Sequence, residues 1–216
     1  MLRAIIRAQW KGSWHVVTAL TVAAAALPIT SVRSGWKGAE TNLPVFLSEL
    51  QLWGLLYPSL AAISAIVLAV GLWASDRRGQ NVYAMLLPIP RWRYVVLRYQ
   101  AGVVLLLPLV AAVWLGALVA TIPLDLPPGL RTFPQALAAK FGLGLILLFG
   151  IAFAIAATSS KALGIAVRFL GLFLAVHIGV WLVDDKVNLI WKVVTLLATW
   201  PGPFAPLGGR WMLIDV

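Results

Sequence analysis

Residues 52–75 read LWGLLYPSLAAISAIVLAVGLWAS, and this stretch without a single charged side chain decides the fold. A helix rises about 1.5 Å per residue, so a helix of this length crosses the roughly 30 Å of hydrocarbon in a lipid bilayer. Trp53, Tyr57 and Trp73 lie near the ends of the stretch, where transmembrane helices carry their interfacial aromatic residues. The stretch therefore predicts a membrane-spanning helix.

Similar apolar runs occur on both sides of this one. They predict four more spans, at 13–31, 100–122, 141–158 and 162–183. A weaker run at 187–199 is interrupted by a lysine and followed by prolines, so it predicts either a re-entrant or interfacial element or a sixth helix. The predicted fold class is all-α, a polytopic transmembrane helical bundle with five clear spans in one domain, 1–216.

The first fourteen residues have a different pattern, with apolar and basic positions at helical spacing. The apolar positions are Leu2, Ile5, Ile6 and Trp10, and the basic positions are Arg3, Arg7 and Lys11. An apolar stripe beside a basic stripe is typical of a helix that lies at the level of the lipid headgroups. We predict such an N-terminal interfacial helix; the alternative is a basic flank of the first span.

The composition supports a membrane protein. Hydrophobic residues make up 62% of the 216 residues, charged residues make up 11%, and the mean hydropathy is +0.94. Soluble domains are closer to half apolar and a quarter charged. A soluble fold of this size could not hide so much apolar surface. The chain has no cysteine, which excludes disulfides and thiolate ligands.

The net charge of +10 comes mainly from short segments between the apolar runs. Nucleic-acid binding needs a dense basic patch on a water-exposed face, so no nucleic-acid partner is expected. The charge is consistent with attraction to anionic membrane lipids and with an unequal number of basic residues on the two sides of the membrane. With a cytoplasmic N-terminus the inner side collects nine basic residues and the outer side five, with three unassigned, so this orientation is predicted.

The segment 76–94, DRRGQNVYAMLLPIPRWRY, is the most distinctive connection in the chain. It begins with the charged residues Asp76, Arg77 and Arg78, which lead to Gly79. A short amphipathic run follows, and prolines end it before the next span. The apolar positions of this run and the residues that end it are Val82, Met85, Leu86, Ile89, Pro88, Pro90 and Arg91.

This pattern resembles the cytoplasmic loop between the second and third spans of ABC-type exporter permeases of the second type. In that family a charged stretch and a glycine precede a short helix, and a turn of two leucines, proline and a basic or hydroxyl residue leads into the third span. The corresponding positions here are Gly79, Leu86, Leu87, Pro88, Pro90 and Arg91. The resemblance covers roughly residues 1–200. Two features depart from it: the charged cluster lacks the usual glutamate, and no full sixth span is evident.

The resemblance implies a transmembrane subunit without an ATPase of its own, and the sequence indeed contains no G-x-x-x-x-G-K-[ST] phosphate loop. The implied partners are a soluble ATP-binding subunit and a second permease subunit, identical or related. The coupling loop, 76–98, would place its apolar face in a groove of the ATPase. The alternative is an ordinary basic loop that sets topology. The implied location is a bacterial inner membrane.

Two polar residues fall inside the fifth predicted span. Charged groups in hydrocarbon are costly, so Arg168 is either a functional residue or one that snorkels or pairs structurally. His177 is nine residues further along, on the opposite side of the helix, and is most simply a packing residue. No catalytic, metal or cofactor residues are predicted. The alternative to a permease is a non-transporting structural subunit of a larger membrane complex.

Overall fold

The computed structural model describes residues 2–39, 53–54, 56–78, 90–122, 130–158, 160–183, 192, 196, 211 and 213–215. Helices form almost all of this part of the chain. They are α1 (Leu2–Ala39), α3 (Leu56–Arg78), α5 (Arg91–Thr121), α6 (Pro134–Thr158) and α7 (Ser160–Val183). Two short strands, β1 (Arg131–Thr132) and β2 (Ile214–Asp215), complete the described elements.

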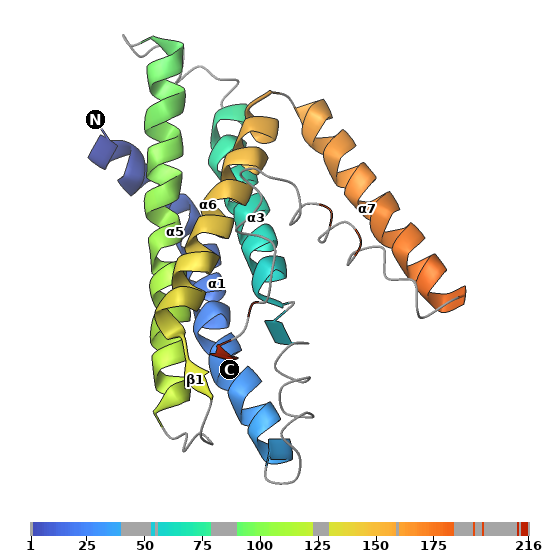
Figure 1. Cartoon of the computed structure of the whole chain (residues 1–216). Coiled ribbons are helices and arrows are strands. Elements are labelled where there is room, and N and C mark those ends of the chain that lie inside the picture. The colour runs from blue at the N-terminus through green and yellow to red at the C-terminus, as the bar shows by residue number, and fades with distance from the viewer. Residues whose placement is uncertain are drawn as a thin grey trace.

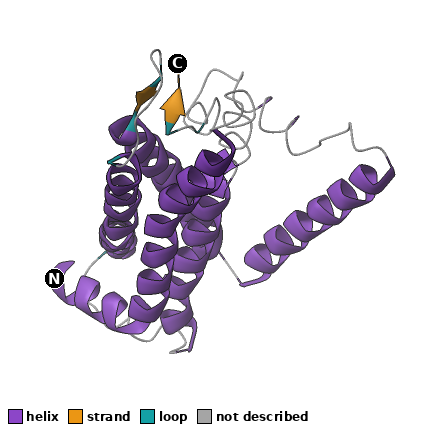
Figure 2. Cartoon of the chain, turned by 90° about the horizontal axis from the view of Figure 1, so that it is seen from below, coloured by secondary structure: helices purple, strands orange, loops and turns teal. Residues whose placement is uncertain are grey.

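Four helices, α1, α3, α5 and α6, lie side by side as a bundle, whereas α7 diverges from it after the end of α6 (Figures 1 and 2). Successive helices run in alternate directions (Figure 1). One end of the bundle therefore gathers the N-terminus of α1, the C-terminus of α3, the N-terminus of α5 and the C-terminus of α6. We call this end the Arg98 end and the other the Trp211 end.

The four bundle helices are those that are long and apolar enough to cross a membrane within the described residues. They include the predicted spans at 13–31, 52–75, 100–122 and 141–158, apart from residues at a few margins. A helix, α7, also covers the fifth predicted span, but a fifth crossing stays a prediction. The run at 187–199 lies outside the described residues, apart from Lys192 and Leu196.

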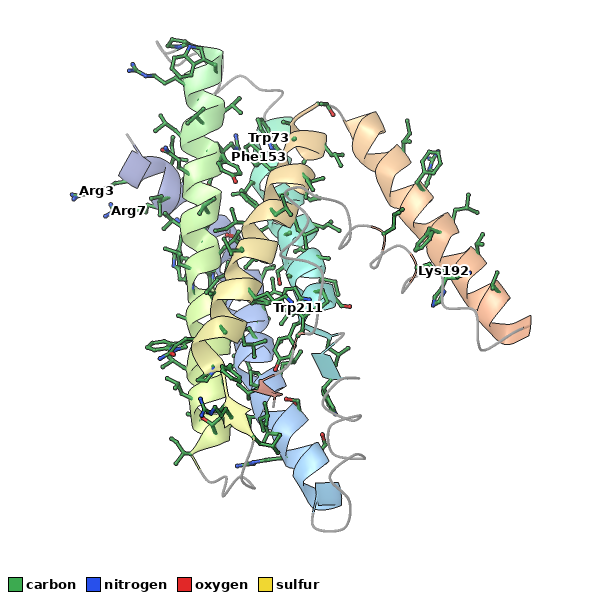
Figure 3. The ribbon with its side chains drawn as sticks, viewed as in Figure 1. Arg3, Arg7, Trp73, Phe153, Lys192 and Trp211 are labelled. Atoms are coloured by element: carbon green, nitrogen blue, oxygen red, sulfur yellow. The ribbon has the colours of Figure 1, made fainter. Side chains whose placement is uncertain are left out.

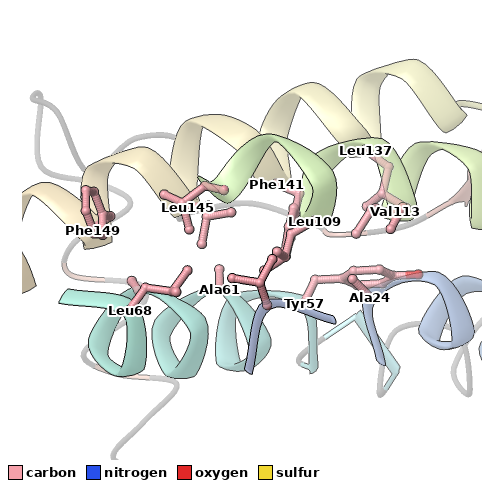
Figure 4. Close-up of a cluster of buried hydrophobic side chains, with 14 of the residues drawn as sticks. Ala24, Tyr57, Ala61, Leu68, Leu109, Val113, Leu137, Phe141, Leu145 and Phe149 are labelled. Carbon is pink, nitrogen blue, oxygen red and sulfur yellow. The ribbon is translucent and has the colours of Figure 1, made fainter. Parts of the chain in front are cut away.

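The contact between α3 and α6 fits small residues against large ones (Figure 4). Ala61, Ala65 and Ala69 recur every fourth residue along α3 and are fully buried. Large side chains at the same spacing face α3 from α6, among them the buried Phe141 and Phe149. Apolar side chains gain little by leaving lipid for protein, so close packing of this kind is what holds helices together in a bilayer.

The contact between α1 and α5 depends on small residues on both helices. A Cβ atom at Gly116 of α5 would overlap the backbone of Ala25 in α1. Ala112 and Ala120, one helical turn on either side of Gly116, are also buried. The two backbones therefore approach one another closely at Gly116, as in the small-residue contacts of membrane helices.

α1 runs without a break from Leu2 to Ala39, so the interfacial helix predicted at 1–14 and the first span form one helix. An interfacial position of its first turns stays a prediction. Two other predicted boundaries are wrong. Residues 32–39, beyond the predicted end of the first span at 31, continue α1. The hydroxyls of Ser13, Ser31 and Ser34 donate to backbone carbonyls three or four residues earlier. The hydrogen bonds of these polar side chains are therefore made within the helix.

The third helix also begins earlier than predicted, at Arg91 rather than near residue 100. Pro90 has φ −58° and ψ 138°, an extended conformation, and its carbonyl accepts from the backbone N–H groups of Arg93 and Tyr94 at 3.0 and 3.2 Å. Proline therefore marks the start of α5. Pro134 differs in being the first residue of α6 itself, a position where its missing N–H costs nothing.

The C-terminal residues return to the bundle, which the all-α prediction missed. Strands β1 and β2 pair antiparallel, with Arg131 opposite Asp215 and Thr132 opposite Ile214. The Phe133 N–H extends the pairing by donating to the Leu213 carbonyl at 2.9 Å. The described fold is therefore helical apart from this short pair at the Trp211 end.

Trp211 anchors the returning segment. Its ring lies 5.0 Å from the Lys140 ammonium, and its carbonyl would be 2.7 Å from a Cβ atom at Gly54. We expect Trp211→Ala to release residues 211–215, since truncating a buried tryptophan costs about 3–5 kcal/mol. Limited proteolysis in detergent should then cut the C-terminal segment faster, with helix content unchanged by circular dichroism. Trp92→Ala, which truncates an exposed tryptophan, should leave the cutting rate unchanged; equal rates in both variants would contradict this role of Trp211.

Candidate functional site

The Arg98 end contains a cation buried among helices. Arg98, in the second turn after the start of α5, is only 3% exposed. Its Nη1 donates to the Tyr94 hydroxyl at 2.6 Å, and its Nη2 donates to the backbone carbonyl of Leu72 in α3. A carbonyl oxygen has two lone pairs, so Leu72 can accept this bond as well as the bond of its own helix.

Aromatic rings stack on the guanidinium. Its Cζ atom lies 4.7 Å from the centroid of the Trp73 ring and 5.5 Å from that of Tyr94. A cation over a ring face gains up to about 2 kcal/mol where water is excluded. The hydrogen bonds and these rings offset the cost of burying the charge. Arg98 therefore ties the last turns of α3 to the first turns of α5.

An aromatic layer continues from this point to α6. Trp73 and Phe153 lie 5.4 Å apart between ring centroids (Figure 3), and Tyr99 lies 5.5 Å from both Phe149 and Phe153. The ring of Phe149 occupies the space over Gly102, where a Cβ atom would overlap it. The Arg98 end is therefore a packed layer of rings and one guanidinium that joins three helices.

The predicted coupling loop is adjacent in sequence to the residues of this layer. Asp76, Arg77 and Arg78 form the last turn of α3, while Pro90 and Arg91 begin α5. The remaining predicted contact residues are outside the described part of the chain: Gly79, Val82, Met85, Leu86 and Pro88. The structure thus places both ends of the loop at the Arg98 end, where Arg98, the last residue of the loop, donates to the Leu72 carbonyl of α3.

The two polar residues of the fifth predicted span lie elsewhere, on α7. Arg168 is exposed and His177 is partly buried. Neither belongs to the Arg98 layer. Within the described residues, no group of three or more histidine, cysteine, aspartate or glutamate side chains is placed to hold a metal ion.

Charge counting places Arg98 among the basic residues near the membrane and does not predict its burial. A signal was present. Arg98 begins a stripe of buried positions that continues along α5 at steps of three and four residues through Ala101, Leu105, Leu109 and Ala112. A basic residue in register with an apolar stripe is a candidate for burial.

The fold defines the class of the protein as a multi-pass helical membrane protein. The chain matches no protein-family model, and comparison with curated proteins and with solved structures also gave no match.

Proposed function

We propose that this chain is the transmembrane subunit of an ATP-driven exporter, powered by a separate soluble ATP-binding subunit that docks at the Arg98 end. Two such subunits, identical or related, would form the export pathway. In this proposal the Arg98 end and the N-terminus face the cytoplasm. The proposal extends the resemblance of the segment 76–94 to exporter permeases.

The observation that carries the proposal is the bond from Arg98, at one end of the loop, to Leu72 of α3, just before the other end of the loop. A loop that is displaced by an ATPase must transmit that displacement to the membrane helices. A flexible connection would not transmit it. Arg98 bonds to Leu72, so a displacement of the loop moves α3 and α5 together. The ring contacts of Tyr99 with Phe149 and Phe153 extend the rigid unit to α6.

The test is Leu86→Asp in the full chain, expressed with the partner ATPase, which in this proposal would be a soluble P-loop ATPase encoded by a neighbouring gene. A carboxylate on the apolar side of the loop would have to enter the groove of the ATPase. Its desolvation costs more than about 1.4 kcal/mol, and that free energy alone is a tenfold loss of affinity. We expect at least about a tenfold loss of ATPase co-purification, with membrane insertion intact.

Gln80→Asp is the matched control, because it adds the same charge to the same segment at a polar position. It should retain the ATPase. Normal ATPase recruitment by Leu86→Asp would contradict the coupling role and favour a structural subunit of a larger membrane complex.

A further inference from the structure

The first turns of α1 expose one face that combines cations with tryptophans. Arg3, Arg7 and Lys11 are exposed, and so are Trp10 at 45% and Trp14 at 44%. The steps between Arg3, Arg7, Trp10 and Trp14 are four, three and four residues, so these side chains share one side of the helix. Lys11 borders the same side. We call these five residues the basic-tryptophan face.

A neighbouring side of the same turns packs toward the bundle. Ile5, Ile6, Gln9 and Ser13 are partly buried, and Val17 beyond them is buried. Arg3 and Arg7 extend away from α5 (Figure 3). The spacing of the sequence predicts Trp10 on the apolar side of the helix, but its exposure places it with the cations instead.

The cations of this face do not stabilise the helix itself through ion pairs or through the helix dipole. The sequence contains no acidic residue before Glu40, so α1 offers its own cations no ion-pair partner. Arg3 lies in the first turn, where the helix dipole disfavours a positive charge. The charge of this face therefore points to a partner outside the helix.

We propose that the basic-tryptophan face binds the headgroups of anionic phospholipids. The candidate membrane span of this helix is Arg3–Ser34, so the face lies at the N-terminal end of that span, where the helix leaves the hydrocarbon. Tryptophan favours this level of a bilayer, since its ring is apolar and its N–H donates a hydrogen bond. Cations at this level attract anionic headgroups. An acidic protein would need the cations but not two half-exposed indoles at the bilayer surface.

The proposal requires membrane insertion but not the exporter assignment. The full chain is reconstituted in nanodiscs of phosphatidylcholine alone, and of equal parts phosphatidylcholine and phosphatidylglycerol. Backbone hydrogen exchange is measured for residues 3–14. The anionic lipid should slow this exchange, by about fivefold for each cation it engages, and high salt should weaken the effect.

The test variant is Arg3→Gln/Arg7→Gln/Lys11→Gln, which should lose the dependence on anionic lipid. The control is Arg33→Gln/Lys37→Gln/Arg131→Gln, which removes the same charge at the Trp211 end and should keep it. Equal exchange in the two kinds of nanodisc would overturn the proposal, and that result would favour an acidic protein partner. A test variant that keeps the dependence, or a control that loses it, would overturn it too. Since ATPase co-purification is a separate readout, the two proposals fail independently.

Discussion

Replacing Gly116 with leucine should separate α1 from α5 and destabilise the whole bundle. The new side chain would have to occupy space held by the backbone of Ala25, and backbone cannot rotate away as a side chain can. Overpacking a tight site costs about 1–3 kcal/mol and more where the backbone must move. We expect the free energy of unfolding to fall by about 3 kcal/mol. This loss should be visible as a lower midpoint of denaturant-induced unfolding in mixed micelles.

Gly71→Leu is the matched control. Gly71 is exposed on α3, and nothing lies within 4 Å of the position that its Cβ would take. The same substitution there should change the unfolding midpoint little. Similar midpoints for the two variants would show that the close approach of α1 and α5 does not stabilise the fold. Gly116→Ala should fall between wild type and Gly116→Leu, because the clash already begins at Cβ.

The second large effect is expected for Arg98→Glu. The carboxylate would face the Leu72 carbonyl and the electron-rich face of the Trp73 ring, where the guanidinium now donates and stacks. Burial of an uncompensated charge costs several kcal/mol. We expect α3 and α5 to separate at the Arg98 end, with a loss of about 3 kcal/mol in the free energy of unfolding and a loss of the proposed ATP-driven transport.

The distance between the two helices can be measured directly. The chain has no cysteine, so spin labels at Ala74→Cys and Val96→Cys report only the ends of α3 and α5. Arg98→Glu should broaden and lengthen the distance distribution, and Arg98→Lys, which keeps the charge but not the forked donor geometry, should do so less. Arg93→Glu makes the same charge change at an exposed site of the same helix and should leave the distribution as it is. An unchanged distribution in Arg98→Glu would contradict the linkage.

Hydrophobic patterning was enough to predict most of the helices. The predicted ends of the fourth and fifth spans, at Thr158 and Val183, coincide with the ends of α6 and α7. Length and apolarity determine such segments locally, so no tertiary information is needed. The continuation of α1 to Ala39 was missed because hydropathy registers serine as polar, whereas Ser31 and Ser34 bond to their own helix.

The candidate site was less predictable because it depends on contacts between distant residues. Arg98 meets Leu72 across 26 positions of sequence, and charge counting gives no sign of that meeting. The pairing of Arg131 with Asp215 is still less local, and a two-residue strand has no periodicity to recognise. Sequence therefore predicts which segments are helical more readily than which of their polar residues are buried together.

The most direct test of the account is the side of the membrane on which each end of the bundle lies. Single cysteines replace exposed residues at the Arg98 end, Trp92 and Thr158, and at the Trp211 end, Ser34 and Phe133. Sealed cells are treated with a maleimide that cannot cross the membrane. The account predicts labelling of the Ser34 and Phe133 positions in sealed cells, and of the Trp92 and Thr158 positions only after permeabilisation. Equal labelling of all four positions in sealed cells, or the reverse pattern, would contradict it.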